Sequence, residues 1–325
     1  MGVTPNTAET GDATTTIDPA TAIGFVSLTV GDLDRSVAFY TDAIGLALLD
    51  REHATATLGV AGRPLLLLTE RAGARPWPRE RRSYTGLYHF ALLVPTRADL
   101  GRFVRHWNVF GLPLGQGDHG VSEALYLSDP DENGIEVYRD RPRDTWHWEG
   151  AQVRMGTGPV DIAGLLAEAE REGAAWQGLP AGTRIGHIHL QIGQIESGAS
   201  FYRDALGFGI VAAMPTALFV SAAGYHHHIG MNTWHSRYAS PAPADMVGLR
   251  FFTVSLPDGD ALEAVVARLA AAGMAHTRTS DGVGIRDPWG TALLLHVGAV
   301  PDAPTVARLA AGAAALPAAT AASLG

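Results

Sequence analysis

The sequence contains no cysteine, and this absence removes several kinds of chemistry at once. Disulfides, thiolate zinc sites, iron–sulfur clusters and cysteine nucleophiles all need that side chain. Any metal ion must therefore use histidine and carboxylate ligands, a set that suits divalent ions of intermediate hardness. The sequence also lacks an apolar run long enough to cross a bilayer, and residues 1–20 lack the basic and apolar regions of a signal peptide. We expect a cytoplasmic protein with no membrane partner.

Positive charge is scarce as well. Lys and Arg together number 24 against 33 Asp and Glu, which gives a net charge of −9. The only local exception is the Arg-rich stretch Arg71–Arg82, whose two prolines indicate a loop. Without a longer basic run to release counterions from a phosphate backbone, we expect no nucleic-acid partner. The length of 325 residues is enough for two domains, each with its own core.

The most informative organisational feature is an internal repeat. IGFVSLTVGDLDRSVAFYTDAIGLALL, from Ile23, matches IGHIHLQIGQIESGASFYRDALGFGIV, from Ile185, at an offset of 162 residues (185 − 23). Two further units share the plan, from Leu87 and from Leu249, and they end in DPDENGIEVY and DPWGTALLLHV. Each unit predicts an alternating strand, a helix and then several strands.

This fourfold pattern resembles the vicinal oxygen chelate superfamily. The resemblance implies an α+β fold in which four βαβββ units form two cup-shaped half-barrel modules. On this basis we expect a disordered N-terminus (1–21), a first module (22–140), a linker (141–183), a second module (184–298) and an Ala-rich tail (299–325). The linker contains a predicted helix at Asp161–Glu172, whereas the tail shows no amphipathic period and predicts a frayed helix or coil.

Strand alternation predicts which side chains of each first strand face the cup. The residues expected to pack on the helices are Val26, Leu28, Val30, Phe90, Leu92, Val94, Ile188, Leu190, Ile192, Phe252, Val254 and Leu256. The residues expected to face the cups are Phe25, Ser27, Thr29, His89, Ala91, Leu93, His187, His189, Gln191, Phe251, Thr253 and Ser255. Only the second and third units therefore present histidine.

The closing strands point to the same two units. Unit two ends with Glu136, while unit four has Leu294 at the matching offset from its Asp-Pro. A set of two histidines and one carboxylate leaves open positions for substrate and dioxygen, and it favours Fe(II). Only a pairing of units two and three brings His89, His187 and Glu136 together. We therefore predict that these units share one cup with the metal, and that units one and four form a metal-free second cup.

Two other ligand sets are open at this point. His189 is an alternative to His187, although His187 aligns with His89 in the repeat. An all-histidine site from His187, His228 and His296 is the other, because His296 lies two residues beyond Leu294 and can face the same cup.

The stretch Gly117–Glu136 carries a second resemblance, to the signature of type I extradiol ring-cleavage dioxygenases. Gly117, His119, Leu125-Tyr126, Asp129-Pro130 and Glu136 match that pattern, and Glu132 departs from it by standing where Gly or Pro is expected. The blocks TGLYHFALLVP and GYHHHIGMNTW extend the likeness to two-module catechol 2,3-dioxygenases.

The resemblance implies roles for four further residues. The resemblance places an acid–base histidine on the closing strand of unit three, where His228 is the best match and His226 the second choice. Alternation predicts these two on one face of that strand and His227 on the other. Tyr126 is expected to bond a substrate oxygen, and His119 to contact a substrate hydroxyl. A neutral imidazole can exchange a phenolic proton near neutral pH.

The implied activity is ring opening of a catechol by O₂ to a muconic semialdehyde, with Fe(II), or alternatively Mn(II), as the ion. We expect a homo-oligomer, since exposed strand edges of this superfamily often pair. The competing hypotheses are a glyoxalase- or isomerase-type reaction on the same scaffold, and a non-catalytic small-molecule binder.

Overall fold

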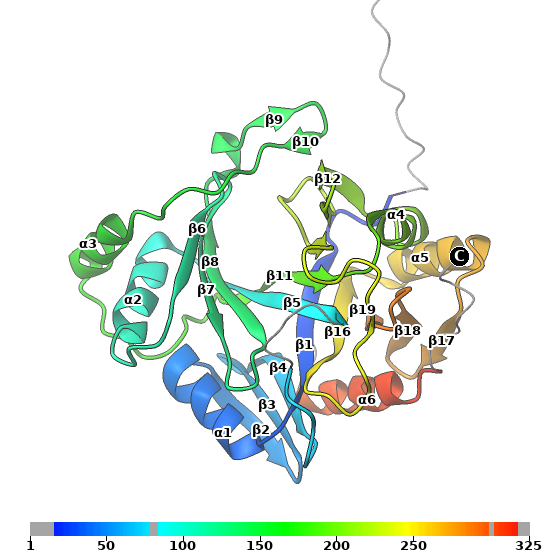
Figure 1. Ribbon diagram of the computed structural model, residues 1–325, viewed down its shortest axis with the longest axis horizontal. Coiled ribbons are helices and arrows are strands. Elements are labelled where there is room, and N and C mark those ends of the chain that lie inside the picture. The colour runs from blue at the N-terminus through cyan, green and yellow to red at the C-terminus, as the bar shows by residue number, and fades with distance from the viewer. Residues whose placement is uncertain (1–15, 78–83, 299–301, 318–325) are drawn as a thin grey trace, which may run out of the picture.

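The computed structural model describes residues 16–77, 84–298 and 302–317. Two mixed sheets dominate the fold (Figure 1). The outer sheet, ordered β17-β18-β19-β16-β1-β4-β3-β2, contains β1 (Ala22–Val30), β2 (Ala47–Glu52), β3 (Thr55–Val60), β4 (Arg63–Glu70), β16 (Gly248–Leu256), β17 (His276–Thr279), β18 (Gly282–Arg286) and β19 (Ala292–Val297). The inner sheet, ordered β12-β13-β14-β11-β5-β8-β7-β6, contains β5 (Tyr84–Leu93), β6 (Gly115–Asp118), β7 (Ser122–Ser128), β8 (Gly134–Asp140), β11 (Arg184–Gln191), β12 (Gly209–Met214), β13 (Ala217–Ser221) and β14 (Ile229–Asn232). The short strand β15 (Ser240–Pro241) pairs with β5.

The strand order confirms the predicted pairing of units. At the centre of the inner sheet, β5 from the second unit pairs antiparallel with β11 from the third. At the centre of the outer sheet, β1 from the first unit pairs antiparallel with β16 from the fourth. Each sheet therefore combines strands from both halves of the chain, and in Figure 1 the inner sheet curves from β6 through β5 and β11 to β12.

One helix follows the first strand of each unit and covers the apolar face of the sheet. In units one and three, a short α-helix continues directly into a π-helical turn. These helices are α1 (Leu33–Ala38) with Phe39–Ile44, α2 (Arg97–Trp107), α4 (Ile195–Ala199) with Ser200–Ala205, and α5 (Gly259–Ala271). The apolar residues predicted to pack on them all belong to one buried core, so the alternation prediction is confirmed. Among the described residues, no helix is long and apolar enough to cross a membrane.

The repeated Phe-Tyr and Asp-Pro motifs form two equivalent buried hydrogen bonds. The Tyr40 hydroxyl, on the first π-helical turn, donates to Oδ2 of Asp129 at 2.8 Å. The Tyr202 hydroxyl, on the second, donates to Oδ2 of Asp287 at 3.0 Å. Each bond joins the helix of one unit to the turn before the last strand of the next, and the Asp129 turn leads directly into β8.

The outer cup is filled with apolar side chains. The repeat offset of 162 residues carries Phe25 onto His187. Leu294 pairs with Thr253 in the outer sheet as Glu136 pairs with Ala91 in the inner sheet, so Leu294 is equivalent to Glu136. Phe251, two residues before Thr253, is likewise equivalent to His89. These three residues pack with side chains of the C-terminal helix α6 (Ala303–Ala314), namely Val306, Leu309 and Ala313. Among the described residues, these apolar side chains offer a metal ion no ligand at the positions equivalent to the triad.

Both ends of the described chain are better ordered than the sequence predicts. The tail was expected to be a frayed helix or coil, but Val306, Leu309 and Ala313 recur along one face of α6, and that face is buried. At the N-terminus, Ile17 is 3 % exposed and its backbone N–H donates to the carbonyl of Gly207 at 2.8 Å. The rest of the predicted disordered segment, residues 1–15, lies outside the described residues, as does 78–83 of the Arg-rich loop.

The linker between the two halves has its own structure. A 3₁₀ turn (Arg143–Thr145) leads into a hairpin of β9 (Trp148–Glu149) and β10 (Gln152–Val153). The predicted linker helix is confirmed as α3 (Ile162–Glu172), whose N-cap Asp161 accepts from the backbone N–H of Gly164. Arg97, on α2, bonds to both Asp161 and Glu168 and so fastens α3 beside α2.

Candidate metal centre

Sheet register brings three buried side chains to one point on the concave face of the inner sheet. Ala91 on β5 lies opposite Glu136 on β8 and opposite His187 on β11. His89, two residues before Ala91, points to the same face because side chains alternate along a strand. The small side chain of Ala91 therefore lies at the centre of a group formed by His89, Glu136 and His187.

The geometry of this group fits a divalent ion. Oε2 of Glu136 lies 3.0 Å from Nε2 of His89 and 3.1 Å from Nε2 of His187. One ligand atom from each residue lies within 4.8 Å of the others, and the three side chains are all buried. Nδ1 of His187 makes no hydrogen bond, and Nε2 of His89 contacts the Glu136 carboxylate. Buried polar atoms rarely lack partners, so this group is consistent with a divalent metal site.

The protonation states also suit metal binding. Burial lowers the pKa of His187 to about 4, which leaves its imidazole neutral at physiological pH. Burial alone would raise the pKa of Glu136, but its interactions with His187 and His89 bring that pKa well below its ordinary value. A neutral imidazole and an ionised carboxylate are the forms that coordinate a metal.

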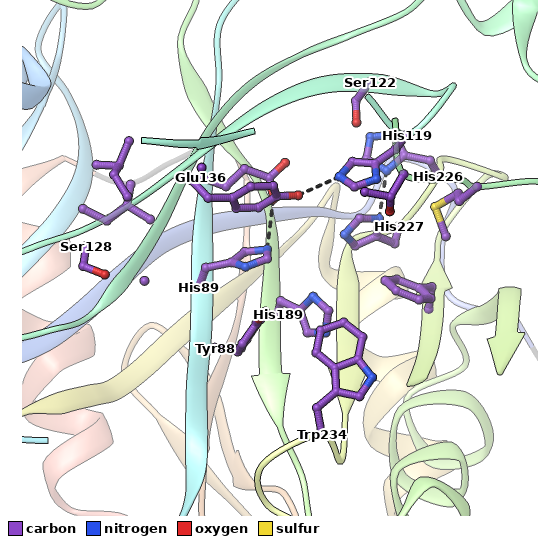
Figure 2. Close-up of a pocket in the computed structure, with 18 of the residues that line it drawn as sticks. Tyr88, His89, His119, Ser122, Ser128, Glu136, His189, His226, His227 and Trp234 are labelled. Atoms are coloured by element: carbon purple, nitrogen blue, oxygen red, sulfur yellow. Dashed lines mark hydrogen bonds and ion pairs between the residues drawn. The ribbon is translucent and has the colours of Figure 1, made fainter. Parts of the chain in front are cut away.

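His89 and Glu136 of the triad line a cavity of about 860 Å³. Figure 2 shows Glu136 and His89 together, with His119, His226 and His227 gathered beside them. Strands β5 to β8 supply one wall, and β12, β13 and the segment after β14 supply the other. The lining includes both aromatic and aliphatic side chains together with the histidines.

His119 and Tyr126, both predicted as substrate contacts, form a hydrogen-bonded pair in this cavity. Nδ1 of His119 lies 2.7 Å from the carbonyl oxygen of Gly156, and Nε2 lies 2.7 Å from the Tyr126 hydroxyl. Because a carbonyl oxygen only accepts, Nδ1 carries the proton, and Nε2 of the neutral ring accepts from Tyr126. Burial raises the pKa of Tyr126 well above its ordinary value, so the hydroxyl keeps its proton.

A second chain of hydrogen bonds fixes the tautomer of His227. Nε2 of His226 donates to Oδ1 of Asp140 at 2.9 Å, and Nδ1 of His226 lies 2.8 Å from Nδ1 of His227. In a neutral His226 the second nitrogen is an acceptor, so Nδ1 of His227 donates. Nε2 of His227 is then an acceptor, and it is buried without a hydrogen-bond partner. Its ring packs against His187, with ring centroids 4.0 Å apart.

The structure does not bring His228 into the cavity. Its Nδ1 accepts from the backbone N–H of Ala222 at 3.1 Å, and its ring lies near Phe208 and Tyr225. His227, predicted to face the other way, lines the cavity instead, together with His226. Strand β14 begins only at Ile229, so the three histidines lie in an irregular segment where period-2 alternation does not apply.

The other ligand sets considered from the sequence do not form. Oδ1 of Asn232 accepts from the backbone N–H of Trp234, so its amide nitrogen faces Nε2 of His189 and donates to it at 3.0 Å. This occupies the lone pair that His189 would offer an ion. His296 lies on β19 of the outer sheet, where its Nε2 is 2.8 Å from Oγ of Ser255.

Sequence reasoning missed the contribution of the linker. Met155, Gly156 and Thr157 line the cavity, and Trp146 packs against His226. The only hint in the sequence that this linker contributes to the cavity is its Trp-containing polar stretch after Glu136. Trp234, whose orientation could not be predicted, also lines the cavity beside His189.

Comparisons with known proteins agree with this architecture. The profile of the Glyoxalase/Bleomycin resistance protein/Dioxygenase superfamily matches residues 22–137 and 184–295. Catechol-2,3-dioxygenase from Bacillus subtilis (strain 168) is 46 % identical over 288 residues, which cover 87 % of this chain and 99 % of that protein.

Two solved structures share the fold. A crystal structure from Bacillus subtilis subsp. subtilis str. 168 superposes with a TM-score of 0.58 at 15 % identity, over 85 % of this chain and 84 % of that one. Glyoxalase I from Zea mays superposes with a TM-score of 0.50 at 17 % identity, over 86 % and 92 %. Together with the repeated units and the buried triad, the profile match and the identity to a curated relative identify the chain as a member of the glyoxalase/bleomycin resistance protein/dioxygenase superfamily.

Proposed function

We propose that this protein is an extradiol ring-cleaving dioxygenase that opens a catechol with O₂ to a muconic semialdehyde, using Fe(II) held by His89, His187 and Glu136. The observation that carries the proposal is the buried His–His–Glu group in a chain 46 % identical to a catechol-2,3-dioxygenase. Fe(II) in such a site supplies chelation of the two adjacent phenolic oxygens and activation of dioxygen. Mn(II) accepts the same ligands and is the alternative ion.

The protein's own part is to bind the catechol and manage its protons. The Tyr126 hydroxyl donates to His119, so its oxygen is placed to accept a hydrogen bond from a phenolic hydroxyl of the substrate. The acid–base role belongs to His227 rather than to His228, because Nε2 of His227 is a buried acceptor without a partner. His226 and Asp140 keep that nitrogen free by fixing the tautomer, and the buried walls exclude water from the reacting ring.

Metal content tests the ligand assignment. Protein reconstituted anaerobically with Fe(II) should bind one ion per chain, and Glu136→Ala and His187→Ala should each abolish this. His189→Ala is the matched control, because His189 is an equally buried neighbour that we exclude as a ligand. Full iron retention in either triad variant, or loss in the control, would contradict the site.

Activity tests the reaction and the acid–base residue. Admission of air to iron-loaded protein with catechol should give the yellow ring-opened product. His227→Asn should retain the metal and lower kcat by about 10²–10⁴-fold, the usual contribution of a general acid or base. His228→Asn should change kcat only a few-fold. The reverse ranking would return the role to His228, and no product from any catechol would refute the dioxygenase proposal.

A further inference from the structure

We propose that the substrate is an uncharged catechol with an apolar substituent, and that catechols bearing a carboxylate are rejected. This inference rests on the proposed function and narrows its substrate class. It follows from the charges and the shape of the cavity away from the triad.

The described residues that line the cavity include three acidic side chains and no permanently cationic one. The acidic residues are Asp129, Glu132 and Glu136. Every one of the 24 basic residues in this chain is arginine, so an arginine would be needed to pair with a substrate carboxylate. None of the described arginines is among the lining residues.

The arginines nearest in sequence to the cavity walls have other partners. Arg139 and Arg141 bond to Glu123 and Asp118. Arg143 lies over the rings of Trp146 and Tyr225, at 5.5 and 5.3 Å from their centroids. Arg154, which precedes the lining residue Met155, pairs with Glu149 on the surface. A carboxylate entering the cavity would thus lose water and meet negative charge, and none of the described arginines would compensate it. The charge of the proposed Fe(II) would be taken up by Glu136 and the two phenolic oxygens of the catechol.

The rim and outer walls are apolar instead. Leu112, Met214 and Trp234 line the cavity, yet they remain 44 %, 45 % and 47 % exposed. Large apolar side chains held half in solvent around a concave site are typical of a surface that receives an apolar ligand. Deeper in the cavity, Phe219 and Ile135 extend this apolar wall. Figure 2 shows Trp234 beside His189, next to the triad rather than remote from it.

The size of the cavity also favours a substituted ring. At about 860 Å³ it lies toward the upper end of the range of about 300–1,000 Å³ that is usual for pockets that bury drug-sized ligands. Unsubstituted catechol is a single ring, so much of the apolar wall would stay uncovered. Each methylene buried against that wall should raise kcat/KM about fourfold.

Matched substrates test the proposal on the iron-loaded full-length protein. 4-Propylcatechol and 3,4-dihydroxyphenylacetate have similar size and differ in charge. We expect kcat/KM to be at least about 100-fold higher for the propyl compound, and to rise from 4-methyl- to 4-propylcatechol. Equal values, or a preference for the carboxylate, would overturn the inference while leaving ring cleavage established.

A rim variant tests the electrostatic cause. Met214→Arg places a cation at the cavity mouth, outside the proposed catalytic residues. It should raise kcat/KM for 3,4-dihydroxyphenylacetate at least about tenfold and lower that for 4-propylcatechol, because a cation replaces part of the apolar wall. Val109→Arg adds the same charge at a position that is 81 % exposed and does not line the cavity, so it should leave both values unchanged. Equal effects of the two variants would refute a local charge mechanism.

Anaerobic binding separates this inference from the proposed function. Isothermal titration calorimetry of the iron-loaded protein under nitrogen should rank 4-propylcatechol well above 3,4-dihydroxyphenylacetate. If neither compound is cleaved in air, the dioxygenase proposal fails, and the binding order still decides the charge preference. Carboxylate binding as tight as that of the alkylcatechol would overturn the inference in either case.

Discussion

The hydrogen bond between Tyr40 and Asp129 offers a quantitative test of how the units are joined. Tyr40 is fully buried, and Asp129 accepts four hydrogen bonds, from the Tyr40 hydroxyl, the Asn133 side-chain amide and the backbone N–H groups of Asp131 and Asn133. Tyr40→Phe keeps the ring and its packing and removes one donor of the four. The carboxylate is therefore weakened but not left without partners.

The expected cost follows from the charge on Asp129. Burial raises the pKa of Asp129 to about 6, so the carboxyl group is ionised at pH 7.5 and protonated at pH 5. A hydrogen bond to a charged acceptor contributes about 1.5–3 kcal/mol, and one between neutral groups about 0.5–1.5 kcal/mol. Tyr40→Phe should lower the free energy of unfolding by about 2 kcal/mol at pH 7.5 and by about 1 kcal/mol at pH 5.

Urea unfolding followed by tryptophan fluorescence measures this loss. Tyr202→Phe removes the equivalent bond to Asp287, whose pKa burial also raises to about 6, and it should behave alike. Tyr238→Phe is the control, since that side chain is 70 % exposed and should cost less than about 0.5 kcal/mol. A Tyr40→Phe loss as small as that of Tyr238→Phe, or one independent of pH, would refute the reasoning.

Two further predictions concern the metal-free protein. Burial lowers the pKa of His187 to about 4, whereas an unfolded chain protonates this imidazole near pH 6.5. Acidification from pH 7 to 5 should therefore lower the free energy of unfolding by about 2 kcal/mol through this residue alone. Burial likewise lowers the pKa of His189, His227 and His228, so these residues also lose stability on acidification. Asp129 and Asp287 act in the opposite direction, because they take up protons on folding between about pH 4 and 6. The larger number of buried histidines should decide the sign. Urea titrations should therefore show lower stability at pH 5, and equal stability would contradict the burial argument. Gly134→Ala would place a Cβ 2.0 Å from the carbonyl oxygen of Tyr88 at the start of β8, so it should destabilise the protein by about 3 kcal/mol and impair metal binding. Gly259→Ala, where a Cβ meets nothing within 4 Å, should be near neutral by thermal denaturation, and a similar melting temperature for the two variants would disprove the steric account.

The sequence predicted those parts of the site that depend on regular local geometry. Alternation along the first strands identified His89 and His187 as cup-facing, because β5 and β11 are continuous strands there. The pairing of units two and three followed from the need to bring two histidines to one carboxylate. The number and type of ligands that a metal ion needs restrict which units can pair, whatever their separation in sequence. The pairing could therefore be predicted before any contact was known.

The errors fall where local periodicity ends. His227 and His228 lie before β14 begins, and their orientation depends on contacts with His226 and Ala222 that no sequence period encodes. The linker residue Met155 reaches the cavity because the β9–β10 hairpin lies beside β12 and the chain then returns to pair with Asp118 at the end of β6. The burial of α6 was missed because alanine dominates that segment and weakens its apolar pattern.

The difference between the two cups has a consequence for how such a protein can diversify. If two identical halves associated as a symmetric dimer, each substitution would appear in both cups, so neither could change without the other. In this protein the two halves are joined in one chain and can change independently. Phe25 and His187 therefore differ although they occupy equivalent positions of the repeat. One cup has become a packed support closed by α6, while the other keeps its polar interior. The same asymmetry means that a fragment containing only one half would carry either His187 or the pair His89 and Glu136. Two separately expressed fragments should therefore recover metal binding only when mixed.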